Sequence, residues 1–218
     1  MSEHYYTKNP TSGHDEREFS VEILGLHLKF QTDAGVFSKD GIDRGTRALV
    51  EAMPPLSGRA LDLGCGWGAA GIPLALKNPG CMFVLTDINE RAAELALRNA
   101  QRNGAGNVTV VTGDAFETVE GAFSWILTNP PIRAGKRAIY DMFGGARDRL
   151  LPGGALYVVI RKQQGAPSAL NFLREAFGNA EVVDRTGGFW VIRAEREAGN
   201  AGNEGNAGGA ALERPPKG

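Results

Sequence analysis

Short apolar runs alternate with amphipathic stretches along most of the chain, between about residues 59 and 194. The runs of strand length read RALDLG, CMFVLTD, NVTVV, FSWILT and ALYVVIR. Helical spacing of apolar residues follows several of them, as in AAGIPLALKN, AGKRAIYDMFGGARDRLL and PSALNFLREAFG. The clearest helix, NERAAELALRNAQRNG, has an N-cap at Asn89 and ends at Gly104. Buried strands separated by helices predict a mostly parallel sheet that is covered on both faces.

Both ends of this region follow another pattern. AEVVDRTGGFWVIRAER holds two strand-like runs joined by DRTGG, which predicts a hairpin and therefore an antiparallel sheet edge. FSVEILGLHLKFQT alternates polar and apolar residues around Gly25, which predicts a second hairpin in an N-terminal extension, residues 1–37. From Glu197 onward the chain is rich in Gly, Asn and Ala and nearly lacks large apolar residues, so residues 197–218 are expected to be disordered. One folded domain is expected over residues 1–196.

Composition narrows the class of protein. A chain of 218 residues with 42% hydrophobic residues suits one globular domain. A net charge of -1 gives no global attraction to nucleic acid or membrane, so any such contact needs a local patch. The N-terminus lacks the apolar segment of a signal peptide, and no apolar run approaches the ~20 residues of a membrane span.

Cysteine and histidine usage adds to this. Cys65 and Cys81 are too few for a disulfide framework and favour a reducing compartment. The histidines, His4, His14 and His27, show no metal-ligand spacing. We therefore expect a cytoplasmic protein without a membrane segment and without a metal.

The stretch ALDLGCGWGAAG joins the first strand to the first helix, which is the usual nucleotide position in an open parallel sheet. Two patterns fit it. Gly66-x-Gly68-x-x-Gly71 matches the dinucleotide fingerprint, whereas Asp62-x-Gly64-x-Gly66-x-Gly68 matches the acidic glycine loop of S-adenosylmethionine enzymes. A carboxylate on Asp62 would repel a pyrophosphate but attract the sulfonium and ammonium groups of S-adenosylmethionine, which favours the second pattern.

Further acids follow the next strands. Asp87 ends the second strand, where a carboxylate can accept hydrogen bonds from both ribose hydroxyls of either cofactor class. Asp114, after the third strand, fits an acceptor for an adenine amino group, and Ala115 leaves room for the ring. Each acid alone is most simply a turn or cap residue. Their shared position at the carboxyl ends of strands favours one cofactor site.

The fourth strand ends abruptly in Asn129-Pro130-Pro131-Ile132, and proline cannot continue a central strand. Methyl transfer to a planar exocyclic amine needs the nitrogen lone pair aimed at the methyl group, so both amine hydrogens need fixed acceptors. The Asn129 side-chain oxygen and the Pro130 carbonyl can supply them, because the proline pair makes a stiff mount. Ile132 can lie on the face of the target base. The simpler alternative is a proline turn that ends a strand.

These motifs resemble class I S-adenosylmethionine-dependent methyltransferases of the "methyltransferase small" group, especially the ribosomal RNA small-subunit methyltransferase C family and its short, single-domain bacterial relatives. The resemblance covers HYYTKNPTSGHD, TDAGVFSKDGIDRGTR, LDLGCGWG, TDINERA, TNPPIRAGK and RKQQGAPSA. It implies an α/β, Rossmann-like fold with a seven-stranded, mostly parallel sheet and an antiparallel last strand. It also implies S-adenosylmethionine as the cofactor.

The resemblance carries over to individual positions. The residues expected to line the cofactor, taken with their neighbours in the same segments, are Asp62, Gly64, Cys65, Gly66, Gly68, Asp87, Ile88, Asn89, Asp114, Ala115 and Asn129. Residues 129–132 would hold the base as the catalytic clamp. Two departures stand out. Many amino-methyltransferases carry an aromatic residue in place of Ile132, which implies weaker stacking here. Longer relatives also carry a second, N-terminal methyltransferase-like domain.

A basic cluster behind the proline pair suggests a nucleic-acid substrate. Arg133, Lys136 and Arg137 stand where a helix should begin, although cations are disfavoured at that end of the helix dipole. The placement suits a bound anion such as an RNA phosphate, to which Arg161 and Lys162 would add charge. The alternative is an idle, solvated basic face.

The segment GVFSKDGIDRGT is interpreted as a loop because of its glycines, Asp40 and Asp43. Phe37 is predicted to pack over the cofactor or target base and exclude water, and Lys39 to contact ligand or RNA. The alternative is a hydrophobic anchor for the N-terminal hairpin.

We therefore predict methylation of an exocyclic base amine of RNA, guanine N2 of small-subunit (16S) ribosomal RNA, either free or within the small ribosomal subunit. A protein glutamine N5-methyltransferase is the alternative within the class, although such relatives usually read NPPY. An NAD(P)-dependent oxidoreductase and a cofactor-free RNA-binding protein are the alternatives outside it. The sequence leaves the oligomeric state open.

Overall fold

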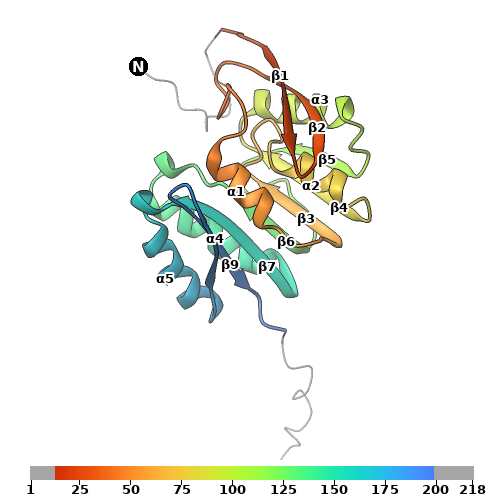
Figure 1. Cartoon of the computed structure of the whole chain (residues 1–218). Coiled ribbons are helices and arrows are strands. Elements are labelled where there is room, and N and C mark those ends of the chain that lie inside the picture. Colours follow the sequence, from red (N-terminus) through yellow and green to blue (C-terminus); the bar gives the residue numbers. More distant parts are fainter. Residues whose placement is uncertain (1–12, 199–218) are drawn as a thin grey trace, which may run out of the picture.

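A seven-stranded sheet forms the centre of the computed structural model, which describes residues 13–198 (Figure 1). The strand order is β5-β4-β3-β6-β7-β9-β8. All pairs from β5 to β7 are parallel, and β9 is antiparallel to both of its neighbours. The strands are β3 (Gly58–Leu63), β4 (Cys81–Asp87), β5 (Val108–Thr112), β6 (Phe123–Thr128), β7 (Leu150–Arg161), β8 (Glu181–Thr186) and β9 (Phe189–Glu195). The predicted mixed sheet is confirmed.

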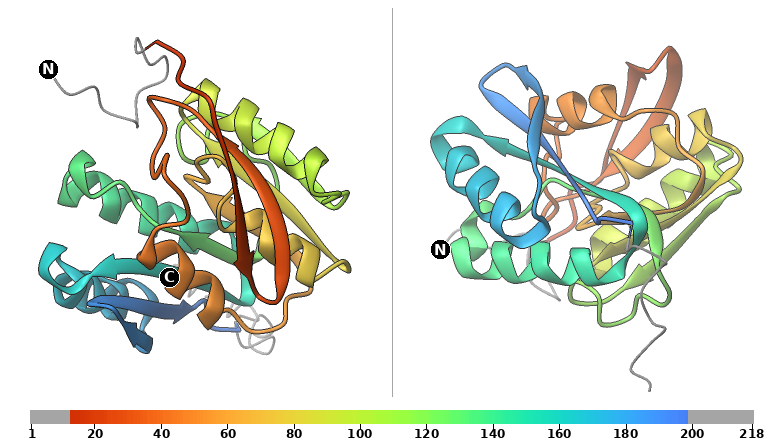
Figure 2. Two further views of the ribbon diagram at one scale, coloured as in Figure 1. Left: turned by 45° about the horizontal axis from the view of Figure 1, so that its top comes forward. Right: turned by 90° about the horizontal axis from the view of Figure 1, so that it is seen from below.

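Helices cover both faces of this sheet, as Figure 2 shows. One face carries α1 (Arg44–Ala52), α2 (Gly71–Lys77) and α3 (Glu90–Arg102), and the other carries α4 (Lys136–Arg149) and α5 (Ala166–Phe177). The buried strand β7 divides its side chains between the two cores, because successive residues of a strand point to opposite faces. Ala155, Tyr157 and Val159 join one core, and Leu156, Val158 and Ile160 join the other.

The predicted N-terminal hairpin is also present, as β1 (Arg17–Ile23) and β2 (Leu26–Thr32). Its turn residues, Leu24 and Gly25, both have positive φ, as a tight hairpin turn requires. The hairpin lies against α3 (Figure 1). There Asn99 pairs its side-chain amide with both the N–H and the C=O of Gln31, at 2.7 and 2.9 Å. The Asn99 side chain on α3 thus makes the pair of hydrogen bonds that a neighbouring strand would make with β2.

The segment GVFSKDGIDRGT is only partly the loop that its composition predicts. Its last residues open α1, whose N-cap is Asp43: the carboxylate accepts hydrogen bonds from the N–H groups of Gly45 and Thr46. Glycine in the first turn of this helix masks the start of the helix in the sequence. The predicted N-cap of α3, Asn89, is confirmed, since its side chain accepts from the N–H groups of Arg91 and Ala92.

The ends of the chain set the limits of the description. The start of the N-terminal extension, with most of the HYYTKNPTSGHD motif, and residues 199–218 of the predicted disordered tail lie outside the described residues. Within residues 13–198, no helix is long and apolar enough to cross a membrane. Both cysteines are free and buried.

Candidate active site

A pocket of about 1060 Å³ lies at the carboxyl ends of the parallel strands, where the sheet topology places ligands. Most of the residues selected from the sequence line it: Phe37, Asp62, Gly64, Cys65, Gly66, Asp87, Ile88, Asp114, Ala115, Asn129, Pro130, Pro131, Ile132 and Arg133. Segments from four strand ends and from the N-terminal loop thus meet at one site. The others do not line the pocket: Lys39, Gly68, Asn89, Lys136 and Lys162.

The glycine loop after β3 is held to the neighbouring strand β4. The N–H groups of Gly64 and Cys65 both donate to the carbonyl of Thr86 at 2.9 Å. Gly64 and Gly66 have positive φ, and a Cβ at either position would meet nothing within 4 Å. The backbone conformation, and not crowding, therefore explains glycine at these two positions. Gly68 differs, since a Cβ there would lie 2.4 Å from Ile72 Cδ1.

Asp62 lies beneath this loop and is only 3% exposed. Its Oδ2 accepts a hydrogen bond from the N–H of Gly71, at the start of α2, at 2.8 Å. Burial raises the pKa of this carboxyl to about 7, the hydrogen bond from Gly71 opposes the rise, and the charge of nearby Asp87 adds to it. A cationic ligand in the pocket would therefore stabilise the ionised form of Asp62.

Asp87 joins the end of β4 to the glycine loop. Its Oδ2 accepts from the N–H of Gly66 at 2.8 Å, and its Oδ1 accepts from the N–H of Asn89 at 2.9 Å. Burial raises the pKa of the Asp87 carboxyl, and both hydrogen bonds oppose that rise. Each oxygen still has acceptor capacity, because a carboxylate offers about four lone-pair sites.

The loop before α1 forms one wall of the pocket. Side chains from the start of α3 and from the glycine loop hold it there by hydrogen bonds. Asn89 Nδ2 donates to the carbonyl of Gly35 at 2.9 Å, and Trp67 Nε1 donates to the carbonyl of Phe37 at 3.0 Å. Val36 is buried in the core, whereas Phe37 is 38% exposed and lines the pocket. Val36 therefore anchors the loop to the core, and the contact of Phe37 with the cofactor or the target base stays a prediction.

Asp114 and Ala115 line the pocket after β5. Ala115 has φ 46°, which is uncommon for a residue other than glycine. Phe116, which sequence reasoning missed, lines the pocket beside them. Cys65, in the glycine loop, also lines the pocket, and burial raises the pKa of its thiol well above the usual value.

The side chain of Asn129, which follows β6, is held by residues at the start of α1. Its Nδ2 donates to Thr46 Oγ1 at 3.0 Å and lies 3.5 Å from Asp43 Oδ2. Thr46 and Asp43 also line the pocket. Sequence reasoning missed Thr46, because only the packing of α1 against β7 and β9 brings it to Asn129.

The proline pair leads into a short 3-10 helix, η1 (Ile132–Ala134). The carbonyl of Pro131 accepts a hydrogen bond from the N–H of Ala134 at 2.9 Å, inside this turn. The carbonyl of Pro131 is thus used within the turn, and the carbonyl of Pro130 stays the predicted second acceptor of the clamp. Pro130 and Ile132 both line the pocket.

Phe189 is a further pocket residue that the sequence did not reveal. It opens β9, directly after the turn of the C-terminal hairpin, and its register partner is Arg161 at the end of β7. An aromatic residue after DRTGG carries no signal by itself. The antiparallel position of β9 next to β7 turns its first residue toward the carboxyl edge of the sheet.

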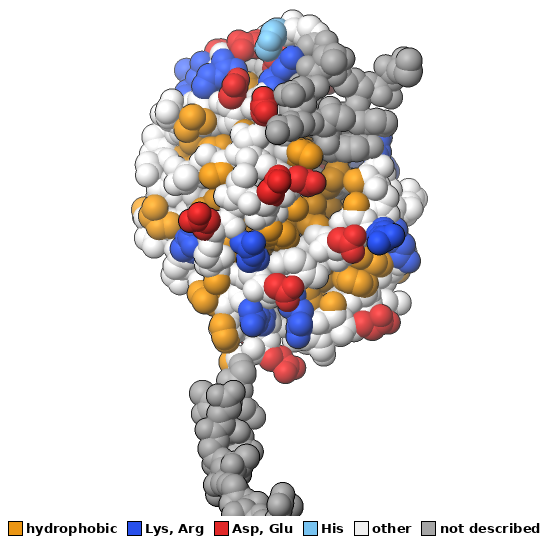
Figure 3. All heavy atoms as spheres, turned by 180° about the vertical axis from the view of Figure 1, so that it is seen from behind, with side chains coloured by type: hydrophobic (Ala, Val, Ile, Leu, Met, Phe, Trp, Pro, Cys, Tyr) orange, Lys and Arg blue, Asp and Glu red, His pale blue; other side chains and the backbone are white. Residues whose placement is uncertain are grey.

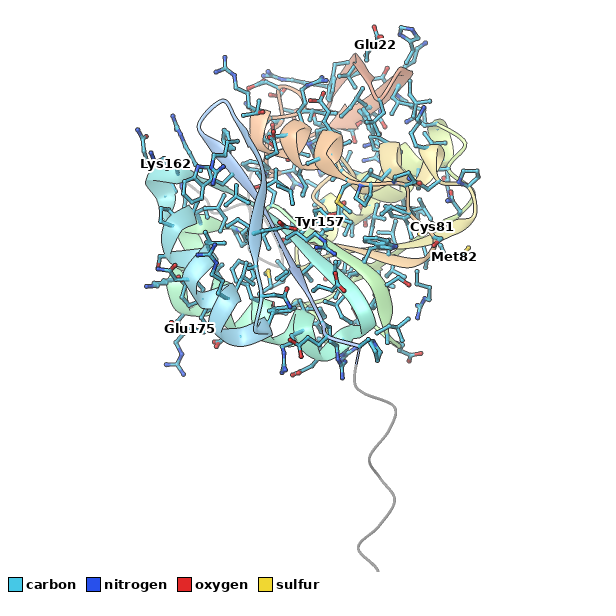
Figure 4. All side chains as sticks on the ribbon, turned by 60° about the horizontal axis from the view of Figure 1, so that its bottom comes forward. Glu22, Cys81, Met82, Tyr157, Lys162 and Glu175 are labelled. Carbon is cyan, nitrogen blue, oxygen red and sulfur yellow. The ribbon has the colours of Figure 1, made fainter. Side chains whose placement is uncertain are left out.

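The predicted basic residues lie around this edge but at different depths. Arg133 and Arg161 line the pocket. Lys136 starts α4, with Nζ 5.2 Å from the centre of the Tyr140 ring. Lys162 begins η2 (Lys162–Gln164), beside the tip of the C-terminal hairpin, where its N–H donates to the carbonyl of Gly188 (Figure 4). On the face shown in Figure 3, cationic and anionic side chains are interspersed.

One group of side chains in the described part of the chain has the spacing of metal ligands: ligand atoms of His14, Glu16 and Asp33 lie within 4.8 Å of one another. Asp33 already accepts hydrogen bonds from His14 Nδ1 and from the N–H groups of Asp15 and Ala34. None of the three ligand residues lines the pocket.

The strand order, the glycine loop and the acids at successive strand ends define a Rossmann-like methyltransferase. Comparison with known proteins identifies the family: residues 27–193 match the model of the methyltransferase small domain. The chain belongs to this family, whose cofactor is S-adenosylmethionine.

Individual relatives place the chain more closely. It is 40% identical over 200 residues to the uncharacterized protein YbxB of Bacillus subtilis, covering 90% of this chain and 100% of that protein. It is 35% identical over 182 residues to ribosomal RNA small subunit methyltransferase C of Escherichia coli, covering 81% of this chain and 51% of that enzyme. The chain thus spans about half the length of the methyltransferase C relatives.

A solved structure shows the same likeness. The 16S rRNA guanine-N2 methyltransferase of Thermus thermophilus, in complex with S-adenosylmethionine and guanosine, superposes with a TM-score of 0.75. The identity is 27%, over 84% of this chain and 51% of that one.

Proposed function

We propose that the protein is an S-adenosylmethionine-dependent N-methyltransferase that acts on an exocyclic base amine of RNA, guanine N2 of small-subunit (16S) ribosomal RNA. The observation that carries the proposal is the position of Asn129. It follows β6 at the carboxyl edge, lines the same pocket as Asp62 and Asp87, and has its amide nitrogen engaged by Thr46. A ribosomal substrate would place the enzyme in the cytoplasm.

The residues present fit the cofactor. The pocket, about 1060 Å³, is lined by three carboxylates at the carboxyl ends of three successive parallel strands. Asp62 would face the cationic groups, Asp87 the ribose hydroxyls and Asp114 the adenine amino group. Burial raises the pKa of Asp62 to about 7, so a cationic ligand would be stabilised by its ionised form, whereas a pyrophosphate would add negative charge beside that carboxylate.

The cofactor supplies an electrophilic methyl group, and the protein has to present the amine to it. Asn129 Oδ1 and the Pro130 carbonyl would accept the two amine hydrogens and fix the direction of the nitrogen lone pair. No strong general base is needed, because the amine proton becomes acidic once the nitrogen is alkylated. Phe37 and Phe189 line the same pocket and would exclude water from the base.

The surroundings of the pocket favour a nucleic-acid base over a glutamine side chain. Arg133 and Arg161 line the pocket, and Lys136 and Lys162 lie on the adjoining turns. A base must leave its stack to reach the clamp, and phosphate contacts nearby offset that cost. The named activity of the Thermus thermophilus relative supports guanine N2 as the position, and the name of the Escherichia coli relative supports small-subunit ribosomal RNA as the substrate.

Calorimetric titration with S-adenosylhomocysteine and with a nicotinamide dinucleotide tests the cofactor class. Binding of the first and not the second is expected, and tight binding of the dinucleotide would instead favour an oxidoreductase. Methyl-transfer assays on ribosomal RNA, small subunits and a release-factor peptide then test the substrate. Transfer to the peptide alone would identify a glutamine methyltransferase.

A further inference from the structure

In the hydrogen-bond network that holds Asn129, each donor and each acceptor can be assigned, starting from Asp43, the N-cap of α1. Asp43 Oδ1 accepts from the N–H groups of Gly45 at 2.9 Å and Thr46 at 3.2 Å. The other carboxylate oxygen, Oδ2, accepts from the hydroxyl of Thr46. A threonine hydroxyl has a single proton, so its oxygen can only accept from any further partner.

This direction determines how the Asn129 amide is turned. The two groups that face one end of it, Thr46 Oγ1 at 3.0 Å and Asp43 Oδ2 at 3.5 Å, are both acceptors. Amide nitrogen and oxygen are assigned from such networks. The reverse orientation would place Asn129 Oδ1 against a carboxylate and an oxygen with no proton left to donate. Oδ1 is therefore turned the other way.

We propose that Asp43 and Thr46 are positioning residues, which hold the Asn129 amide so that its oxygen and not its NH₂ group faces the substrate amine. The inference rests on the proposed function, because only an amine substrate needs an acceptor at this point. With the amide reversed, two donor groups would face each other and the amine would lose one of its fixed acceptors.

Helix capping alone does not explain this arrangement. An N-cap needs a single side-chain oxygen, and Asn caps as well as Asp. Asp43 Oδ1 already fills that role, yet Oδ2 is directed to the Thr46 hydroxyl. Thr46 is only 5% exposed, so its hydroxyl is withdrawn from water and the polarity of the network is fixed by the protein.

Asp43→Asn tests the proposal because it reverses the polarity and keeps the cap. The new NH₂ group donates to Thr46 Oγ1, the Thr46 proton turns toward residue 129, and the Asn129 amide flips to meet it. We expect kcat for RNA methylation to fall on the order of tenfold or more, with melting temperature and affinity for S-adenosylhomocysteine nearly unchanged. Asp40→Asn is the matched control, since Asp40 lies in the same loop with a 74% exposed side chain.

A second substitution should restore the acceptor. In Asp43→Asn/Asn129→Asp, the carboxylate at position 129 accepts from Thr46 and still offers an oxygen to the pocket. Activity should exceed that of both single variants, because Asn129→Asp alone sets two carboxylates side by side. Thr46→Ser should retain activity and Thr46→Val should lose it. Wild-type kcat in Asp43→Asn, or a double variant no better than Asp43→Asn, would overturn the proposal.

A measurement without turnover separates this inference from the proposed function. In the wild-type protein, the Asn129 side-chain NH₂ should give protected amide resonances in ¹⁵N-edited spectra, and Thr46→Val should speed their exchange with water. Unprotected resonances in the wild type would refute the polarity. If the resonances are protected and no RNA is methylated, the proposed substrate is wrong and the network is not.

Discussion

The Phe189 ring occupies the space that a side chain at Gly45 would need: a Cβ there would lie 2.9 Å from the ring atoms Cδ1 and Cε1. Gly45 follows the N-cap of α1 by two positions, in the turn that also carries Thr46, the partner of Asn129. Phe189 therefore lies beside the helix turn that holds Asn129, and both residues line the pocket. Phe189 is in a position to offer the aromatic face that Ile132 does not.

Phe189→Ala should weaken use of RNA, since stacking of a base on an aromatic side chain contributes about 1–3 kcal/mol. We expect a higher KM for RNA with little change in affinity for S-adenosylhomocysteine, measured by steady-state kinetics and calorimetry. Phe189→Tyr should keep the KM. Phe189→Leu preserves apolar volume without a ring, so a wild-type KM in this variant would argue against stacking.

The raised pKa of Asp62 predicts a pH dependence of cofactor affinity. A cationic ligand favours the ionised carboxylate, so affinity for S-adenosylmethionine should rise as pH increases through about 7. If only the ionised form binds, the Kd falls about tenfold between pH 6 and pH 8. Asp62→Asn keeps an acceptor for the Gly71 N–H and removes the titration, so its profile should be flat over this range. A sloping profile in the variant would assign the dependence to another group.

The same carboxyl predicts a stability trend with the opposite sign. Its folded-state pKa is raised above the unfolded value, so its contribution is fully present below about pH 4 and is lost as pH rises through about 7. In the protein without ligand, the free energy of unfolding of the wild type should therefore decline relative to that of Asp62→Asn over this interval. Urea unfolding of both proteins at matched pH values measures the difference. Parallel curves would show that Asp62 is ionised in the folded protein.

Lys136 should contribute to RNA binding through phosphate. Each phosphate contact adds about 0.7–0.9 to the slope of log K against log salt, so Lys136→Ala should reduce that slope by about one such increment. Affinity for the cofactor should stay the same, because Lys136 does not line the pocket. Lys77→Ala is the control, since Lys77 is exposed at the end of α2 away from the pocket. An equal effect of both substitutions would indicate general charge attraction only.

Substitutions of Val36 and Phe37 should affect different properties, the first mainly stability and the second mainly turnover. Val36 is buried, so Val36→Ala should lower the melting temperature and leave kcat largely intact. Phe37 lines the pocket, so Phe37→Ala should lower kcat with a smaller loss of stability. Thermal unfolding and methyl-transfer rates of the two variants give the comparison. Unchanged turnover with a lower melting temperature in Phe37→Ala would make Phe37 an anchor as well.

Much of the fold and cofactor wall followed from local sequence patterns. Apolar runs located the strands, and the acids that end them, such as Asp87, belong to the pocket because carboxyl ends of parallel strands share an edge. Thr46 and Phe189 could not be found this way. Each enters the pocket through contacts between distant segments. The hairpin pattern places Phe189 on an antiparallel strand but does not reveal that this strand pairs with β7 beside the pocket.

The start of α1 was missed for a related reason. Gly41 and Gly45 around Asp43 are typical of a loop, and glycine is a poor helix former. Glycine at position 45 is explained by the close approach of the Asp43 carboxylate and of the Phe189 ring, which comes from a segment far along the chain. Three lysines were expected at the site but do not line the pocket: Lys39, Lys136 and Lys162. A charge in the sequence does not reveal whether the side chain reaches the pocket or only its surroundings.

The central claim is methyl transfer to a guanine amine of small-subunit ribosomal RNA, and the most direct measurement is mass-spectrometric analysis of the methylated nucleoside. The purified protein, labelled S-adenosylmethionine and unmodified small subunits or 16S rRNA are incubated, and the RNA is digested to nucleosides. The proposal predicts label in N2-methylguanosine, lost with Asn129→Ala. Label in another nucleoside, or label only in a release-factor peptide offered in parallel, would contradict it.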